Sequence, residues 1–411
     1  MSNEKPNFII VLLDDLGYGD LGCFGSETIR SPRIDSLAAE GAKLTAMYTP
    51  VAVCSPSRAA LLTGRQPQRT GVTYALQDHD TIGLPASELT LAQLLKDQGY
   101  RTALAGKWHL GSLPQFNPTH YGFDYFFGVL YSNDLQPFDL YKNEAILEKE
   151  TNQAALSRRF TNQIIQFIRK APDQPFFAYL SHIMPHEPLS VEAPFQGKSR
   201  AGLYGDTIES VDFHLGRLLD RLEGEFGIRD NTFIVVLSDN GPWHEGSAGG
   251  LSGRKRSVYE GGVRVPCVIR YPRGIPPGLV IDQPTSMMDF VPTMVRMAGG
   301  ALPPDREYDG LDIGPALAGG PMPARPPLFF TGPTPPNVTQ SPATALRAGR
   351  WKLVVAPGTP DRVRLYDLEA DSAESMNLAA DHPDVVAQML GEINTLSTAG
   401  RYRGPRKTRN A

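Results

Sequence analysis

The segment from Asn7 to Asp15, NFIIVLLDD, is a continuous apolar run that ends in two adjacent carboxylates. A run of this kind, without alternation between apolar and polar residues, is typical of a strand buried on both faces of a sheet. Such strands lie in parallel sheets that are covered by helices on both sides. Asp14 and Asp15 are therefore expected at the carboxyl end of a central strand.

Further apolar segments of strand length alternate with segments of helical spacing. Strands are predicted over residues 101–108, 175–182, 232–237 and 265–271, and helices over residues 33–41, 89–98, 156–170, 203–226 and 287–298. This alternation predicts an α/β protein with helices on both faces of its sheet. Ligand sites of such sheets lie beyond the carboxyl ends of the strands, where the polar clusters of this chain also fall.

The composition changes near residue 302, where proline and glycine pairs begin to cluster. Beyond them, residues 343–355 and 362–367 predict antiparallel strands, and residues 385–396 predict a last helix. We therefore expect a large α/β domain over residues 1–325 and a small α+β domain with an antiparallel sheet over residues 326–411.

The bulk composition limits the partners and the compartment. A formal net charge of −4 provides no basic surface for nucleic acid, and no apolar run is long enough to span a membrane. The first residues lack the apolar segment of a signal peptide, and three cysteines are too few for a disulfide framework. We expect a cytoplasmic protein, or a periplasmic or secreted one if the natural start has been replaced.

The segment CSPSRAALLTGR begins at Cys54. Pro56 suits the first turn of a helix, which places Cys54 at a helix N-terminus, where free N–H groups and the helix dipole favour an anion. Arg58, one turn further along, can direct its guanidinium at the same anion. From these residues alone, a buried structural cysteine remains the alternative.

Two strand ends carry oxygen ligands. Asp14 and Asp15 end the first strand, and Asp239 and Asn240 follow the strand predicted over residues 232–237. Three carboxylates and an amide oxygen are hard ligands, which suit calcium or magnesium rather than zinc. A divalent cation also offsets the repulsion between adjacent carboxylates, so the two motifs together predict a metal site.

Taken together, these motifs resemble the type I, formylglycine-dependent sulfatases of the alkaline phosphatase superfamily, in particular the arylsulfatase-A-like members. The resemblance is strong over residues 7–264 and weak beyond them. It rests on the Cys54 segment, Asp14-Asp15, GKWHLG at 106–111, PHEP at 185–188, SDNG at 238–241 and GRKRSVYEGGVR at 253–264. It implies an alkaline phosphatase-like fold, with a large, mostly parallel sheet sandwiched by helices.

The resemblance also implies a nucleophile and a cofactor. Cys54 would be oxidised by a formylglycine-generating maturation enzyme to Cα-formylglycine, whose hydrated aldehyde attacks sulfur. One divalent metal, Ca²⁺ in most members and Mg²⁺ in some, would be held by Asp14, Asp15, residue 54, Asp239 and Asn240. Asp239 would also accept a proton from the aldehyde hydrate.

Cations and histidines receive their expected roles from the same resemblance. Lys107 and Lys255 would bind the sulfate together with Arg58. His109 would accept the proton whose removal releases sulfate, and His186, assisted by Lys255, would bind the leaving-group oxygen and protonate it.

Ser132 and Asn133 stand where related enzymes carry a Ser-His-Asp run beside the substrate. Asn133 departs from that pattern, so a hydrogen bond to sulfate or substrate is expected of it instead of a proton transfer.

The predicted function is hydrolysis of a sulfate monoester to an alcohol or phenol and inorganic sulfate. The substrate is a small-molecule or carbohydrate sulfate ester, and the sequence leaves both an aryl and a sugar group open. One alternative is a phosphonate or phosphate monoester hydrolase of the same superfamily. A second is a non-catalytic sulfoglycan-binding protein, which should have lost some of the site residues, whereas all are present.

Overall fold

The computed structural model describes residues 5–335, 342–359 and 362–398. The remaining residues, including 399–411 of the predicted C-terminal domain, lie outside the described part. Within it, no helix has the length and apolarity needed to cross a membrane.

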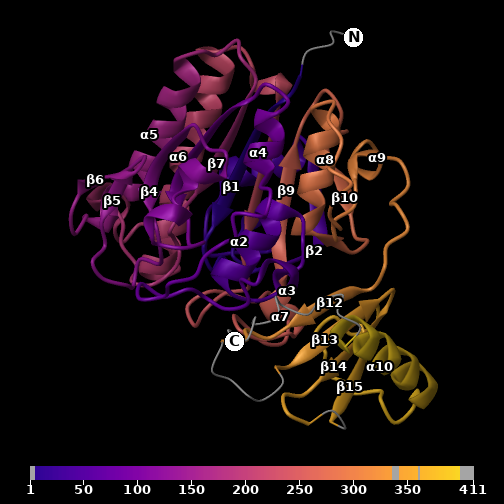
Figure 1. Cartoon of the computed structure of the whole chain (residues 1–411). Coiled ribbons are helices and arrows are strands. Elements are labelled where there is room, and N and C mark those ends of the chain that lie inside the picture. The colour runs from indigo at the N-terminus through magenta and orange to yellow at the C-terminus, as the bar shows by residue number, and fades with distance from the viewer. Residues whose placement is uncertain (1–4, 336–341, 360–361, 399–411) are drawn as a thin grey trace, which may run out of the picture.

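An eleven-stranded sheet organises the larger part of the molecule (Figure 1). Its strands follow the order β10-β2-β9-β8-β1-β7-β3-β4-β5-β6, and β11 pairs with β2. Their bounds are β1 (Asn7–Leu13), β2 (Ala42–Tyr48), β3 (Arg101–Lys107), β4 (Tyr125–Val129), β5 (Leu140–Lys142), β6 (Ala145–Glu148), β7 (Phe176–Ser181), β8 (Thr232–Ser238), β9 (Arg264–Arg270), β10 (Leu279–Ile281) and β11 (Thr285–Ser286).

The central strand is β1, which runs parallel to both neighbours, β7 and β8. Strand β3 continues the parallel set between β7 and β4, whereas β9 runs antiparallel to β8 and β2. Every residue of β1 is buried. The predicted α/β fold with a mostly parallel sheet is thereby confirmed.

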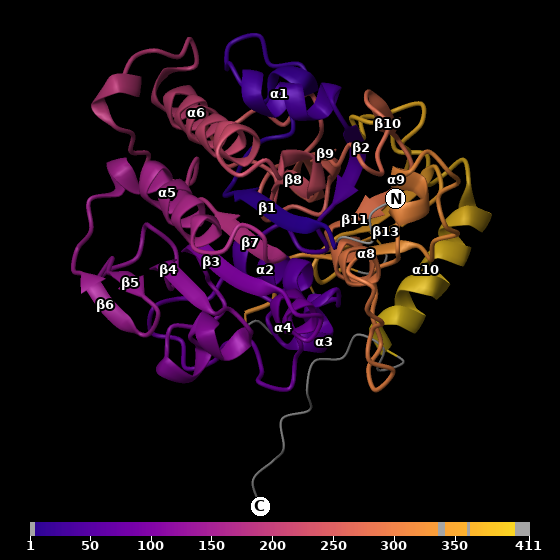
Figure 2. The ribbon, with the colours of Figure 1, turned by 90° about the horizontal axis from the view of Figure 1, so that it is seen from above.

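Helices cover both faces of this sheet (Figure 2). One layer holds α1 (Pro32–Ala39), α5 (Leu156–Arg169) and α6 (Gly202–Gly224), and the other holds α2 (Cys54–Thr63), α4 (Leu91–Lys96) and α8 (Phe290–Met297). Alternate side chains of β1 enter the two cores: Ile9 packs in the layer of α5 and α6, whereas Ile10 packs in the layer of α2 and α8. The continuous apolar run of β1 is explained by these two cores.

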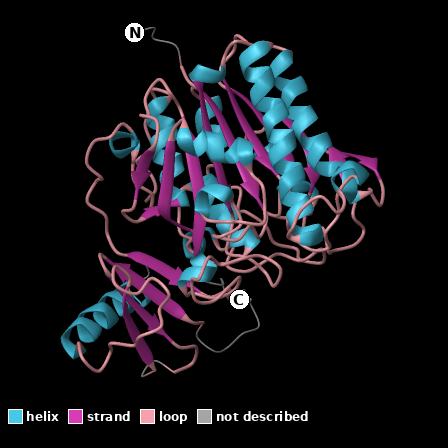
Figure 3. Cartoon of the chain, turned by 180° about the vertical axis from the view of Figure 1, so that it is seen from behind, coloured by secondary structure: helices cyan, strands magenta, loops and turns pink. Residues whose placement is uncertain are grey.

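A second sheet lies at one end of the first (Figures 1 and 3). This C-terminal sheet consists of the antiparallel strands β12 (Leu328–Thr331), β13 (Thr344–Ala348), β14 (Trp351–Val355) and β15 (Val363–Asp367). Helix α10 (Pro383–Thr398) packs on one face through Met389 and Ile393. The opposite face contacts Tyr48, Val258 and other residues of the larger part. The domain boundary after residue 325 remains a prediction.

Three further helices, each of four residues, lie in connecting segments. They are α3 (Pro67–Thr70), α7 (Glu260–Val263) and α9 (Gly314–Leu317). Helix α7 directly precedes β9 and follows the loop that carries Lys255. Helix α7 thus contacts both that loop and the C-terminal sheet.

Candidate active site

Neighbouring strands place their polar residues at one edge of the sheet. Asp14 and Asp15 follow β1, Lys107 ends β3, His186 lies beyond β7, and Asp239 follows β8. Helix α2 begins at Cys54, whose Sγ lies 3.3 Å from Asp14 Oδ1. Because β1, β3, β7 and β8 are parallel, their carboxyl ends bring together residues that are far apart in sequence.

The oxygen ligands predicted from the sequence gather around Cys54. Ligand atoms of Asp14, Cys54 and Asp239 all lie within 4.8 Å of one another, as do those of Asp15, Cys54 and His186. Asn240 donates its amide N–H to Asp15 Oδ1 at 2.7 Å, whereas its buried Oδ1 has no hydrogen-bond partner in the described structure. An unsatisfied buried oxygen beside three carboxylates fits a hard divalent cation.

Each carboxylate of this cluster has a cation beside it, and Asp14 has two, because Arg58 Nη2 also lies 3.5 Å from Asp14 Oδ2. Lys107 Nζ lies 2.5 Å from Asp14 Oδ2, Lys255 Nζ lies 2.7 Å from Asp15 Oδ2, and Arg58 Nη2 lies 2.9 Å from Asp239 Oδ2. Burial alone would raise the pKa of Asp14, but Lys107 and Arg58 hold it well below its ordinary value. Three cations converging on one small volume provide a site for a divalent anion.

Arg58 is the most completely bound of these cations. Its Nε and Nη2 both donate to Asp239 Oδ2, at 3.2 and 2.9 Å. Its Nη1 donates to the Lys107 carbonyl at 3.0 Å and to Ser181 Oγ at 2.6 Å. The side chain is fully buried, so the guanidinium connects β3, β7 and β8 at the edge where the site lies.

The thiol of Cys54 does not have the properties of a reactive thiolate. It is buried, and burial together with the charge of Asp14 raises the pKa of the thiol above its ordinary value. Reactive cysteines have lowered pKa values in partly exposed, electropositive surroundings. An unmodified Cys54 would therefore stay protonated at neutral pH.

The two histidines of the site each have one ring nitrogen fixed by a backbone carbonyl. His109 Nε2 lies 2.8 Å from the Leu76 carbonyl, so Nε2 carries the proton and Nδ1, which has no partner among the described residues, is an acceptor. Burial and then Lys107 lower the pKa of His109 well below its ordinary value. His109 is therefore neutral and able to accept a proton.

His186 has the opposite tautomer. Its Nδ1 donates to the Glu187 carbonyl at 2.5 Å, and its Nε2 lies 3.7 Å from Asp15 Oδ2. Burial lowers the pKa of His186, whereas the negative charges near Lys255 outweigh its burial and raise the pKa of that lysine. Lys255 therefore keeps its proton while His186 is neutral.

A pocket of about 400 Å³ opens over this cluster. Asp15, His186 and Lys255 form part of its wall. The sequence did not single out four of the other lining residues as site residues: Asp134, Glu187, Pro188 and Arg256. The remaining one, Trp243, lies in the loop after β8, and the Arg256 guanidinium stands 5.4 Å from the centre of its ring. The sequence contains both residues but does not show that this aromatic ring and this guanidinium lie beside one another.

Ser132 and Asn133 are placed differently from one another. Ser132 Oγ accepts a hydrogen bond from Lys107 Nζ at 3.1 Å, at the edge of the cation set. Asn133 is fully buried, and its amide donates to Gln153 Oε1 at 3.0 Å and to the His186 carbonyl at 3.2 Å. In this structure Asn133 supports the turn that carries His186, and its neighbour Asp134 lines the pocket.

The fold and this cluster define a hydrolase site for a sulfate-like anion, and comparison with known proteins gives the family. The model of the Sulfatase family matches residues 6–301, and that of the N-sulphoglucosamine sulphohydrolase C-terminal region matches residues 253–399. The chain belongs to the sulfatase family. The resemblance inferred from the motifs is thus confirmed, and the protein is a sulfatase enzyme.

Its relatives are sulfatases as well. Human steryl-sulfatase is 35% identical over 409 residues, covering 77% of this chain and 70% of its own. Dog N-acetylgalactosamine-6-sulfatase is 37% identical over 369 residues, covering 82% of this chain and 70% of its own. The crystal structure of Ps i-CgsB in complex with k-i-k-neocarrahexaose superposes with a TM-score of 0.87 at 27% identity, covering 96% of this chain and 93% of that one.

Proposed function

We propose that this sulfatase uses a Cα-formylglycine formed from Cys54 by a formylglycine-generating enzyme. The observation that carries the proposal is the position of Cys54, buried at the start of α2 within reach of Asp14 and Asp239. A protonated, buried thiol is a poor nucleophile. The hydrated aldehyde would supply the attacking hydroxyl and, through its second hydroxyl, a route for releasing sulfate.

The metal proposed for this site is Ca²⁺, with Mg²⁺ as the second choice. Asp14, Asp15, Asp239, the amide oxygen of Asn240 and residue 54 would hold it. Calcium accepts many oxygen ligands in flexible geometry, whereas magnesium requires a near-ideal octahedron and retains several waters. When bound, such an ion neutralises charge on the sulfate oxygens and favours ionisation of a hydroxyl.

Three cations are proposed to hold the sulfate. Arg58, Lys107 and Lys255 are fixed by carboxylates or backbone before the substrate arrives. Donors that are already oriented stabilise the developing negative charge without reorganisation. Asp239, paired with Arg58, would accept the proton of the attacking hydroxyl.

Two proton transfers complete the proposed reaction. His186 and Lys255 together would protonate the departing oxygen: Nε2 of the neutral His186 carries no proton, so the proton would come from the Lys255 ammonium directly to that oxygen. Nδ1 of His109, the free acceptor of that ring, would take the proton whose removal releases sulfate. The Leu76 carbonyl holds His109 in the tautomer that this step needs.

The substrate is proposed to be a small-molecule or carbohydrate sulfate ester. Trp243 lines the pocket of about 400 Å³, and its ring would offer a stacking surface for an aryl group or a sugar. The named activities of the relatives include a steryl ester and an amino-sugar ester, and they support both classes.

The test compares one aryl group carried as sulfate, phosphate and phosphonate. Protein matured in a host with the formylglycine-generating enzyme should release para-nitrophenol fastest from the sulfate. A chelator should abolish turnover, and added Ca²⁺ should restore it, because the carboxylates repel one another and the sulfate without a cation. Faster turnover of the phosphate or the phosphonate would contradict the assignment.

A further inference from the structure

A buried ionic cluster connects the C-terminal sheet to the segment that carries Lys255. Lys352, in β14, is fully buried, and its Nζ lies 2.9 Å from Glu260 Oε1 and 3.0 Å from Glu374 Oε1. Glu260 is the first residue of α7, whereas Glu374 follows β15. A lysine and two carboxylates are thus removed from water where the two parts of the chain meet.

Further polar groups surround the Glu260 carboxylate. Tyr48 donates its hydroxyl proton to Glu260 Oε2 at 2.6 Å, and Arg264 Nη1 lies 3.4 Å from the same oxygen. Arg347 of β13 contacts the Tyr48 hydroxyl. Buried ion pairs contribute little net stability, because desolvation cancels much of their attraction, and in some proteins their role is to fix relative positions. The cluster is therefore better explained as a device that holds α7 and the C-terminal sheet in fixed relative positions.

Glu374 also caps α7. Tyr259, the N-cap residue, makes no side-chain cap hydrogen bond, and the backbone N–H of Glu260 donates instead to Glu374 Oε2 at 2.6 Å. The first N–H groups of a helix have no partner within it and need one from outside. Here that partner comes from beyond β15, 114 positions further along the chain.

The backbone of α7 contacts two segments of the site: the loop that carries Lys255 and the turn that carries Asn240. Gly261 donates its N–H to the Ser252 carbonyl at 2.6 Å, which closes the loop that carries Lys255. Gly262 accepts at its carbonyl from the Gly241 N–H at 2.8 Å, directly after Asn240. A Cβ on Gly241 would approach the Gly261 carbonyl oxygen to 1.9 Å, so the two backbones are in close contact. A displacement of α7 would move Lys255 and Asn240 together.

We propose that Glu374 and Lys352 are positioning residues for the sulfate site: they fix the start of α7 and, through its backbone, set Lys255 and Asn240. The proposal rests on the sulfate-binding function proposed for Lys255. It gives the C-terminal sheet a part in binding sulfate although none of its residues lines the pocket over the site.

The sharpest variant is Glu374→Gln, which preserves the size of the side chain. Two donors face the Glu374 carboxylate: the Glu260 N–H donates to Oε2, and the Lys352 ammonium lies 3.0 Å from Oε1, with which it makes an ion pair but no hydrogen bond. An amide has one acceptor oxygen, so its NH₂ group must face one of these donors. Lys352→Met is the second variant, because it removes the ammonium that Glu260 and Glu374 share and leaves only Arg264 beside Glu260.

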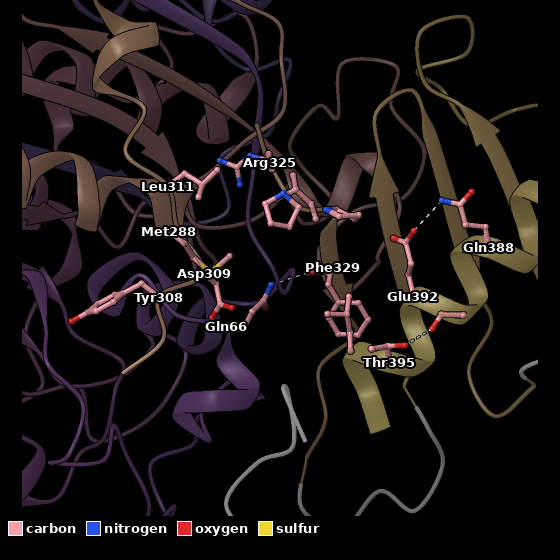
Figure 4. Close-up of a pocket in the computed structure, with 15 residues that line it drawn as sticks. Gln66, Met288, Tyr308, Asp309, Leu311, Arg325, Phe329, Gln388, Glu392 and Thr395 are labelled. Atoms are coloured by element: carbon pink, nitrogen blue, oxygen red, sulfur yellow. Dashed lines mark hydrogen bonds between the residues drawn. The ribbon is translucent and has the colours of Figure 1, made fainter. Parts of the chain in front are cut away.

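The control is another contact between the α/β part and the C-terminal sheet, one that does not involve α7. A cavity of about 550 Å³ lies where the parts meet. Figure 4 shows Gln66 on one side of it and Phe329 of β12 on the other. Gln66 Nε2 donates to the Phe329 carbonyl at 3.2 Å. Gln66→Ala removes this hydrogen bond and leaves Glu260, Lys352 and Glu374 in place.

The probe is inorganic sulfate, titrated calorimetrically into the calcium-loaded proteins, with melting temperatures measured in parallel. Glu374→Gln and Lys352→Met should weaken sulfate binding about tenfold or more, since small displacements of binding groups are costly. Gln66→Ala should lower the melting temperature and keep the wild-type sulfate affinity. Unchanged sulfate affinity in a folded Glu374→Gln protein would overturn the proposal, whereas absence of sulfate binding by the wild type would contradict the proposed function instead.

Discussion

Replacing Arg58 with methionine removes a buried positive charge whose four hydrogen bonds all lie between 2.6 and 3.2 Å. The Asp239 carboxylate, also buried, then loses its cation. Breaking a buried pair by deleting one partner costs about 3–5 kcal/mol, because the remaining charge stays without compensation. Arg58→Lys keeps the charge but loses the guanidinium geometry, and a cost of about 1.5–3 kcal/mol is expected for the lost charged hydrogen bonds.

Urea unfolding followed by fluorescence gives these differences as the shift in midpoint multiplied by the slope. Arg30 supplies the control, since its pair with Glu209 is even shorter, at 2.6 Å against 2.9 Å for Arg58 and Asp239, but its side chain is 69% exposed. Arg30→Met should leave the midpoint almost unchanged, because exposed ion pairs are screened by water. Equal midpoints for Arg58→Met and Arg30→Met would refute the argument that burial makes this guanidinium indispensable.

Three further predictions concern single residues. Cys54→Ser should release one equivalent of phenol per protein and then stop, because serine lacks the second hydroxyl; repeated turnovers would contradict the formylglycine mechanism. Burial, with His214 nearby, lowers the pKa of the His182 ring to about 3 in the folded protein. In the unfolded chain this pKa returns to about 6.5, so protonation below that pH favours unfolding. About 2 kcal/mol of stability is therefore lost by about pH 5. His182→Leu should shrink the fall in urea midpoint between about pH 7 and pH 5, and an unaltered fall would refute this linkage. Gly106→Ala should prevent folding, because its Cβ would meet the Ser181 carbonyl oxygen at 1.7 Å. The control Gly99→Ala has open space around its Cβ and should cost only about 1–2 kcal/mol of stability. Soluble yield and circular dichroism measure both variants, and equal yields would contradict the steric argument.

The sequence predicted a strand well where burial of both faces left a single apolar pattern. The run that forms β1 is apolar from Phe8 to Leu13 because both of its faces are buried, and such a run is typical of a central strand. Strand β2 was missed because Lys43 and Thr45 interrupt its apolar residues and its two faces differ in burial. No strand was predicted over residues 113–149, yet they contain β4, β5 and β6, of which β6 is mostly exposed and carries little apolar signal.

For the site, residues at strand ends could be found because the parallel order of β1, β3, β7 and β8 brings those ends together. Contacts between distant segments could not be found in the same way. Nothing in the run around Lys352 indicates that its partners stand at positions 260 and 374, and nothing near Asn133 indicates that its amide holds the His186 turn. Such pairings depend on how the second sheet and the long loops pack, which periodicity does not encode.

The most direct test of the formylglycine mechanism is the mass of the tryptic peptide that runs from Leu44 to Arg58. The protein should be produced in a host that matures sulfatases, with Cys54→Ser as the reference for an unconverted residue. We predict a peptide in which the Cys54 thiol has been replaced by an aldehyde or its hydrate. A thiol of unchanged mass in protein that turns over sulfate esters would contradict the account, because a different nucleophile would then carry the reaction.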